Sequence, residues 1–238
     1  MDEDKLFIDE KLGDEPFRFD DSVARVFPDM LRRSIPGYAA SIEAIGSLAA
    51  RYVRPGTNCY DLGCSLGAAT LAMKQGIRVP DCRIVAVDNS AAMIERCREI
   101  VGDAGIVDLR LADIRDIEIA NASMVVMNYT LQFIGVDERD GMVRRIADGM
   151  NDGGLLVLSE KVVDENAHME DLLVELHHEH KRRNDYSELE ISRKRAALEN
   201  VLVPETVARH RQRLSDAGFA HSAVWLRYFN FVSIVAIK

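Results

Sequence analysis

Three acidic residues, Asp61, Asp88 and Asp113, close three successive short apolar runs in the first half of this 238-residue sequence. Runs of this length and composition are typical of buried β-strands. A carboxylate at the end of a strand can accept hydrogen bonds from the hydroxyl groups of a ribose, or it can pair with a cation. Its repetition at three strands indicates a binding site for a nucleotide-like ligand.

The first run leads directly into a glycine loop, DLGCSLG at residues 61–67, and then into small, helix-favouring residues. A strand that feeds straight into a helix leaves the first N–H groups of the helix unpaired, and glycines let a ligand approach that backbone. The spacing of Gly63 and Gly67 differs from the dinucleotide fingerprint G-x-G-x-x-G. A glycine-rich turn is also a common packing device, and Cys64 inside the loop fits either a ligand contact or tight packing.

Strand-like and helix-like segments alternate through residues 58–159. We expect strands at 58–61, 83–88, 107–113, 123–128 and 155–159, and helices at 68–75, 89–101 and 137–150, the last closed by Gly153-Gly154. This order predicts an α/β fold with a doubly wound, mostly parallel, seven-stranded Rossmann-like sheet and a C-terminal antiparallel hairpin at 222–237. Ligands of such sheets bind at the carboxyl ends of the strands, where Asn128 joins the three acids.

The segments on either side of this alternation are less regular. Before it, we expect a helix at 20–27, a restart at Pro28 with a helical turn at 29–33, and a helix that Tyr38 opens after a turn. Tyr38 fits a core aromatic residue better than a lid over a cofactor. Near the C-terminus, a helix from Pro204 to about Ala217 should precede the hairpin.

Residues 162–201 replace the expected single crossover by two charged helices. An insertion at this point can cover the ligand or contact another subunit. His177 and His180 have the spacing of helical zinc ligands, but the segment offers no further partner at that spacing, and we expect no metal. The basic clusters at 181–183 and 193–195 are ordinarily solvated helix faces, although an arginine there could clamp a carboxylate.

The composition limits the classes of partner. A formal net charge of −9 disfavours direct binding to nucleic acid or to an acidic membrane. The acidic N-terminus lacks the features of a signal peptide, no run approaches the roughly 18 apolar residues of a membrane span, and no cysteine pair has C-x-x-C spacing. We therefore expect a cytoplasmic protein with free thiols and a single domain at 1–238, of which 1–18 form a mobile leader.

Several motifs together carry a closer resemblance. The glycine loop, the acids after the second and third strands and the closing hairpin resemble the class I S-adenosylmethionine-dependent methyltransferase fold, with Ser65 in place of the usual middle glycine. From Phe19 onward, nearly the whole chain resembles the carboxy-S-adenosyl-L-methionine synthase family, through VFPDMLRRSIPGY, YDLGCSLGAATL, NSAAMIERCR, NASMVVMNYTLQF, GGLLVLSEK, YSELEISRKRAALENV and FNFVSIVAIK.

This resemblance implies a transferase that converts S-adenosyl-L-methionine and prephenate into carboxy-S-adenosyl-L-methionine and phenylpyruvate. In the mechanism proposed for the family, prephenate loses its ring carboxylate as carbon dioxide and expels hydroxide, which helps to deprotonate the sulfonium methyl group. The resulting ylide captures the carbon dioxide. The product supplies a separate tRNA carboxymethyltransferase that modifies wobble uridine, and the family is homodimeric, with the insertion as the expected interface.

Position by position, the resemblance implies ligand contacts at Tyr38, Gly63, Cys64, Ser65, Asp88, Asn89, Asp113, Ile114, Asn128 and Arg195. Asp88 would accept hydrogen bonds from both ribose hydroxyls. Asp113 would accept one from the adenine amino group, and the backbone of Ile114 would meet the ring edge. Arg195 would clamp the extra carboxylate of the product, and no general base is assigned.

Two other functions stay open at the level of sequence. The fold also suits an ordinary methyltransferase, although the net acidity and the sequence NYTL at 128–131, in place of an N-P-P-Y-type motif, argue against one. A non-catalytic carrier of the carboxylated nucleotide would need the same ligand contacts. Turnover with prephenate distinguishes the three.

Overall fold

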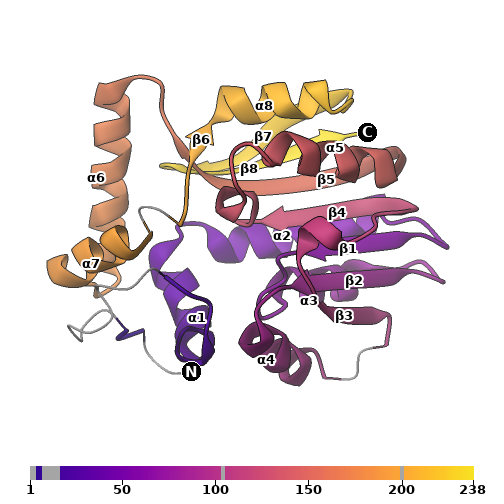
Figure 1. The fold of residues 1–238 in the computed structure, drawn as a ribbon, viewed down its shortest axis with the longest axis horizontal. Helices are drawn as coiled ribbons and strands as arrows, with labels where there is room; N and C mark the ends of the chain where they lie inside the picture. Colours follow the sequence, from indigo (N-terminus) through magenta and orange to yellow (C-terminus); the bar gives the residue numbers. More distant parts are fainter. Residues whose placement is uncertain (1–3, 7–16, 103–104, 199–200) are drawn as a thin grey trace.

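The structure is a computed structural model that describes residues 4–6, 17–102, 105–198 and 201–238. Its centre is an eight-stranded sheet in the order β3-β2-β1-β4-β5-β8-β7, with the two-residue β6 paired to β5 (Figure 1). Strands β1 to β5 are parallel, and β8 is antiparallel to both β5 and β7. The predicted doubly wound α/β fold with a C-terminal hairpin is confirmed, and β6 is an addition that the sequence did not indicate.

The strands are β1 (Asn58–Leu62), β2 (Arg83–Asp88), β3 (Val107–Leu111), β4 (Ala122–Asn128), β5 (Met150–Val163), β6 (Glu205–Thr206), β7 (His221–Tyr228) and β8 (Phe231–Ile237). The helices are α1 (Asp21–Ser34), α2 (Tyr38–Tyr52), α3 (Ala68–Gly76), α4 (Ala91–Val101), α5 (Arg139–Gly149), α6 (Ala167–Arg183), α7 (Glu188–Leu198) and α8 (Val207–Asp216). Two short 3-10 helices, η2 (Ile114–Asp116) and η3 (Leu131–Phe133), follow β3 and β4.

Two hydrophobic layers cover the faces of the sheet. On one face, Leu62, Val125 and Leu156 pack with residues of α5 and α8 such as Ile146 and Leu214. On the other, alternate residues of the same strands pack against α2, α3 and α4. Strands that are buried on both faces read as continuous apolar runs, which is why the sequence reveals them so clearly.

The carboxyl ends of β1, β2 and β4, with the loops that follow them, form what we call the ligand edge. Asp61, Asp88 and Asn128 all end at this edge, as the parallel pairing requires. Successive strands are added on one side of β1 as far as β3 and then on its other side from β4 onward, so the strand order switches between β1 and β4, and ligands of open α/β sheets bind at such a switch point.

The structure corrects four predicted boundaries. Residues 21–34 form one helix with Pro28 inside it, because burial of Val26, Phe27 and Met30 outweighs the hydrogen bond that proline removes. Strand β3 ends before Asp113, which instead caps η2. Helix α5 ends at Gly149, and residues 151–154 lie in an irregular start of β5. Helix α8 begins after a Thr206 cap rather than at Pro204.

Both helices of the insertion are confirmed, as α6 and α7, and they stand beyond one end of the sheet, next to α1 (Figure 1). Most of the predicted N-terminal leader lies outside the described residues. Asp4, within it, is only 1% exposed; its backbone N–H donates to Asp29 Oδ2 over 2.9 Å, and its carboxylate lies 3.4 Å from Lys194 Nζ. The start of the chain thus contacts both α1 and α7.

Candidate functional site

The glycine loop is held in a left-handed backbone conformation. Gly63 and Gly67 have φ angles of 80° and 82°, and Ser65 between them has φ 50°. A serine in this region is strained, so a glycine at the position is favoured by the backbone as well as by size. A Cβ on Gly63 would overlap the side chain of Thr130, so a glycine here lets the loop after β1 approach the loop after β4 closely.

Asp88 lies at the centre of the ligand edge. Its Oδ2 accepts from the Ser65 N–H and its Oδ1 from the Ser90 N–H, both over 2.9 Å. Burial raises the pKa of this carboxyl, and the backbone donors oppose that rise. Each oxygen keeps a further lone pair, which is what a pair of ribose hydroxyls would require. Asn89 beside it is exposed.

Cys64 points away from the ligand edge. Its side chain is buried against Cys97, and that contact together with burial raises the pKa of its thiol. Its backbone N–H donates to the carbonyl of Val87 over 2.9 Å. For this side chain, packing is the observed role.

Asp61, which is buried at the end of β1, lies close enough to the half-buried Tyr38 for its charge to act on the phenol. Asp61 is 1% exposed and accepts from Thr70 Oγ1 over 2.5 Å, and burial raises its pKa to about 6. Tyr38 opens α2 as predicted, and burial followed by the nearby Asp61 charge raises the pKa of its phenol. Thr70, which fixes this carboxylate, was missed at the level of sequence, although its spacing from Asp61 suits a strand-turn-helix contact.

Asp113 and Ile114 follow β3, the strand next to β2, and so lie beside the ligand edge. Both oxygens of Asp113 bind the guanidinium of Arg115, at 3.0 and 2.7 Å, and this contact lowers the pKa of Asp113 despite partial burial. Arg115 also bridges to Glu138 at 2.9 Å. Ile114 is buried in the layer beneath α5. The acceptor predicted for an adenine amino group is therefore held in place by an arginine.

Asn128 presents an unpaired acceptor at the ligand edge. Its Oδ1 is buried and has no hydrogen-bond partner among the described residues. A buried acceptor left unpaired is destabilising by about 1–3 kcal/mol, so such atoms usually meet a ligand or water. The next residue, Tyr129, has φ 61° and its ring lies edge-on to Phe231, with centroids 5.9 Å apart. Neither aromatic residue was predicted to belong to the site.

Arg195 lies on an exposed part of α7. Within the described chain, no hydrogen bond or ion pair engages its guanidinium. Its charge is close enough to Lys161, on β5, to contribute to the lowered pKa of that amine, after the larger effect of burial. The predicted clamp is thus a free cation on the side of the molecule where β5 ends.

The two histidines with zinc-like spacing have other partners. His177 Nε2 lies 2.9 Å from the carbonyl of Ser34, and its ring is edge-on to Phe231. His180 lies near Asn184. Across the described ranges, no cluster of three or more His, Cys, Asp or Glu side chains could hold a metal ion.

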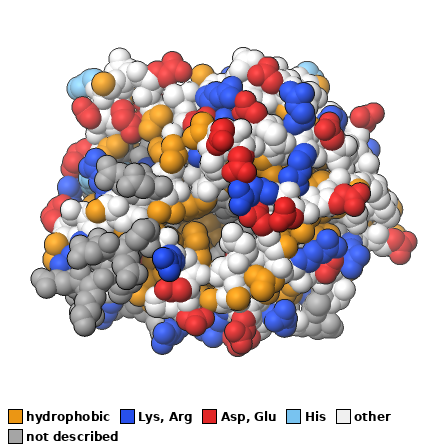
Figure 2. Space-filling view, in the orientation of Figure 1, with side chains coloured by type: hydrophobic (Ala, Val, Ile, Leu, Met, Phe, Trp, Pro, Cys, Tyr) orange, Lys and Arg blue, Asp and Glu red, His pale blue; other side chains and the backbone are white. Residues whose placement is uncertain are grey.

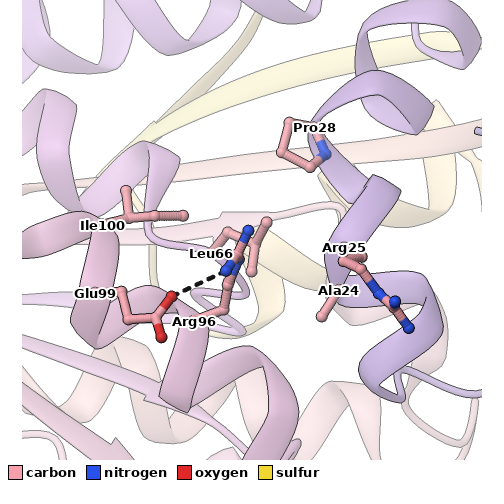
Figure 3. Close-up of a pocket in the computed structure, with 7 residues that line it drawn as sticks. All are labelled: Ala24, Arg25, Pro28, Leu66, Arg96, Glu99 and Ile100. Atoms are coloured by element: carbon pink, nitrogen blue, oxygen red, sulfur yellow. Dashed lines mark hydrogen bonds and ion pairs between the residues drawn. The ribbon is translucent and has the colours of Figure 1, made fainter. Parts of the chain in front are cut away.

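A hollow of about 330 Å³ borders the glycine loop on the side of α4. Figure 3 shows Ala24 and Pro28 of α1 across from Arg96 and Ile100 of α4, with Leu66 of the loop between them. Figure 2, in the orientation of Figure 1, shows hydrophobic side chains on the walls of a hollow near the middle of the visible face. The hollow between α1 and α4 borders the predicted site only at the glycine loop, through Leu66.

The fold and the ligand edge together define the class I S-adenosylmethionine-dependent methyltransferase fold. Residues 60–154 match a family described as a methyltransferase domain. The structure of human N-acetylserotonin methyltransferase in complex with S-adenosylmethionine aligns with a TM-score of 0.64 and 16% identity, over 92% of this chain and 55% of that one. A magnesium protoporphyrin IX methyltransferase from Synechocystis aligns with a TM-score of 0.57 and 16% identity, over 85% and 80%.

Curated relatives identify the family within that class. A carboxy-S-adenosyl-L-methionine synthase from Trichlorobacter lovleyi is 56% identical over 93% of both chains, and one from Escherichia coli is 54% identical over 96% of this chain and 93% of that one. The chain belongs to the carboxy-S-adenosyl-L-methionine synthase family, whose members are transferases that use S-adenosyl-L-methionine.

The ligand edge fits S-adenosyl-L-methionine. The spare lone pairs of Asp88 suit the ribose, the unpaired Oδ1 of Asn128 suits a hydrogen-bond donor, and the buried carboxylate of Asp61 favours a positively charged ligand nearby. None of the helices in the described parts of the chain is both long and apolar enough to cross a membrane.

Proposed function

We propose that this chain makes carboxy-S-adenosyl-L-methionine from S-adenosyl-L-methionine and prephenate, with release of phenylpyruvate and water. The observation that carries the proposal is the free guanidinium of Arg195 close to Lys161. Transfer of a methyl group requires no cation beside the methyl, whereas a carboxylate formed there requires one. An arginine fork can hold that carboxylate through two charge-assisted hydrogen bonds.

The proposed reaction balances without a redox partner. Prephenate breaks the bond to its ring carboxylate, which leaves as carbon dioxide, and its ring becomes aromatic as hydroxide departs. The hydroxide takes a proton from the sulfonium methyl group, and the new carbon–carbon bond joins that carbon to carbon dioxide. A stray proton donor would quench the carbanion, so helices α6 and α7 serve as a cover that excludes water.

The proposal extends to assembly and location. Helices α6 and α7 expose Met169, Leu172 and Leu189, each more than 40% accessible, and large exposed apolar side chains favour an interface between two copies of the chain. All four cysteines are buried and free, as expected for a protein of the reducing cytoplasm. The product then passes to a separate tRNA carboxymethyltransferase, without direct binding of nucleic acid by this acidic chain.

The test is mass spectrometry of the nucleotide released when protein purified from cells is denatured. The proposal predicts S-adenosyl-L-methionine plus one carboxyl group, and an Arg195→Ala variant that loses its preference for this form over S-adenosyl-L-methionine by about tenfold or more. If only S-adenosyl-L-methionine or its demethylated product is released, methyl transfer becomes the better proposal. Equal relative affinities in the variant reject the clamp.

A further inference from the structure

A second set of basic side chains lies where β5 ends, on the face of the sheet that α2 covers. We call Lys161, His177 and Lys181 the basic wall. Lys161 is paired with Phe231 across β5 and β8, so the two side chains share this face. The ring of Phe231 is 4.8 Å from that of His177, and Lys181 is one helical turn further along α6.

His177 and Lys181 of the basic wall are buried and Lys161 is half-buried, and no acid in the described ranges pairs with either lysine. Lys181 is 8% exposed, and its Nζ has no hydrogen bond or ion pair with any residue in the described ranges. Burial first, and then the charges of Lys194 and Lys161, lower its pKa to about 7. The charge of Asp4 opposes this lowering, and the carboxylate of Asp4 lies 3.4 Å from Lys194 Nζ. A buried amine that lacks a hydrogen bond and lies near other positive charges destabilises the fold unless an anion binds it.

Lys161 has a similar surrounding. Burial and the charge of Arg195 lower its pKa, while Glu170 opposes them. Glu170 is itself engaged, because its Oε2 accepts from the backbone N–H of Asp164 over 2.7 Å. Two lysines thus approach one region from a strand and a helix, and the acids nearest to them have other partners.

Aromatic side chains connect the basic wall to the ligand edge. Phe231 contacts both His177 and Tyr129. Tyr129 follows Asn128, whose Oδ1 has no hydrogen-bond partner among the described residues. A ligand that spans this distance would present a ring to Phe231 and Tyr129 and an anionic group to the lysines. Prephenate carries a six-membered ring and two carboxylates, of which it retains one as phenylpyruvate.

We propose that Lys161 and Lys181 bind the carboxylate that prephenate retains, while Phe231 and Tyr129 contact its ring. The carboxylate that leaves as carbon dioxide would then face Asn128 and Arg195, close to the sulfonium methyl group. This subsite rests on the proposed function. It separates the two carboxylates by role, because the lysines hold the retained one and the departing one lies beside the methyl group that captures the carbon dioxide.

Binding of phenylpyruvate, measured by calorimetry on the full chain saturated with S-adenosyl-L-methionine, tests the subsite. Lys181→Met and, separately, Lys161→Met should each weaken phenylpyruvate binding about tenfold or more, with affinity for S-adenosyl-L-methionine within about twofold of the wild type. The matched control is Lys238→Met, because Lys238 follows β8 at the opposite edge of the sheet. The control should bind phenylpyruvate as the wild type does.

Thermal unfolding distinguishes a binding lysine from a structural one. Removal of an unpaired buried amine should leave the melting temperature of Lys181→Met unchanged or raised, whereas loss of a structural contact would lower it. Unchanged phenylpyruvate affinity in variants of a chain that turns over prephenate would overturn the subsite alone. A wild-type chain that neither turns over prephenate nor binds phenylpyruvate would overturn the subsite and the proposed function together.

Discussion

At the scale of single residues, Asn128 distinguishes binding from folding. Its buried Oδ1 has no partner in the described chain, so Asn128→Ala should leave the free energy of unfolding within about 0.5 kcal/mol of the wild type. The same change should weaken binding of S-adenosyl-L-methionine about tenfold or more, because a ligand donor loses its acceptor. Calorimetric titration and thermal unfolding measure the two quantities. A variant that is destabilised but binds normally would show that Asn128 is structural.

Glu160 makes stability depend on pH. Burial raises its pKa to about 8, its Oε1 accepts from the Leu131 N–H over 3.0 Å, and its Oε2 has no partner among the described side chains and backbone. Between the unfolded pKa near 4.5 and the folded value, the folded chain holds the proton more tightly. Stability from this group therefore falls as pH rises through that window, by on the order of a few kcal/mol, and stays low above it.

Replacement by glutamine should remove this dependence. Thermal unfolding from pH 5 to pH 9 should show a smaller loss of stability for Glu160→Gln than for the wild type. Glu165→Gln, which removes an exposed carboxylate, controls for the change in net charge. Parallel stability curves for the wild type and Glu160→Gln would show that Glu160 is ionised throughout.

At the scale of elements, the turn between β1 and α3 depends on contact with the end of β4. Gly63→Ala combines a positive φ with an overlap against Thr130, whereas Gly56→Ala has a similar φ of 70° and no atom within 4 Å. Gly56→Ala should cost about 1 kcal/mol of unfolding free energy, and Gly63→Ala at least about 2 kcal/mol more. Denaturant unfolding of both variants measures the difference. Equal losses would mean that Thr130 moves aside freely.

The elements that the sequence predicts well carry their signals locally. Helix α4 was expected with a cap at Asn89 or Ser90. The structure has the cap at Ser90, whose Oγ accepts from the Met93 N–H over 3.2 Å, and buries Met93, Ile94, Cys97 and Val101 as expected. The length of α1 and the pairing of β6 could not be predicted, because packing overrides Pro28 and because two residues form a strand only against the far end of β5.

The same distinction applies to the site. The glycine loop and Asp88 follow consecutive strands, so their convergence at one edge could be predicted from chain order. Phe231 and Lys181 come near the edge only through the fold, since β8 inserts beside β5 and His177 of α6 contacts Phe231. The burial of Asp4 was equally unforeseen, because it depends on α1 and α7.

At the scale of the whole molecule, helices α6 and α7 are the proposed contact between two copies of the chain. Leu172→Glu places a charge on this surface and should convert a dimer into a monomer, which light scattering coupled to size-exclusion chromatography measures. Leu111→Glu is the control, because Leu111 is equally apolar, 56% exposed and on β3. A monomeric wild type, or a dimer that survives Leu172→Glu, would contradict this assignment.

The most direct test of the central claim is turnover with isotopically labelled substrate. The purified chain is incubated with S-adenosyl-L-methionine and prephenate that carries carbon-13 in its ring carboxylate, and the nucleotide is analysed by mass spectrometry. The account predicts carboxy-S-adenosyl-L-methionine with the label in its new carboxyl group, formed in equal amount with phenylpyruvate. Prephenate that stays intact, or a nucleotide product without the label, would contradict it.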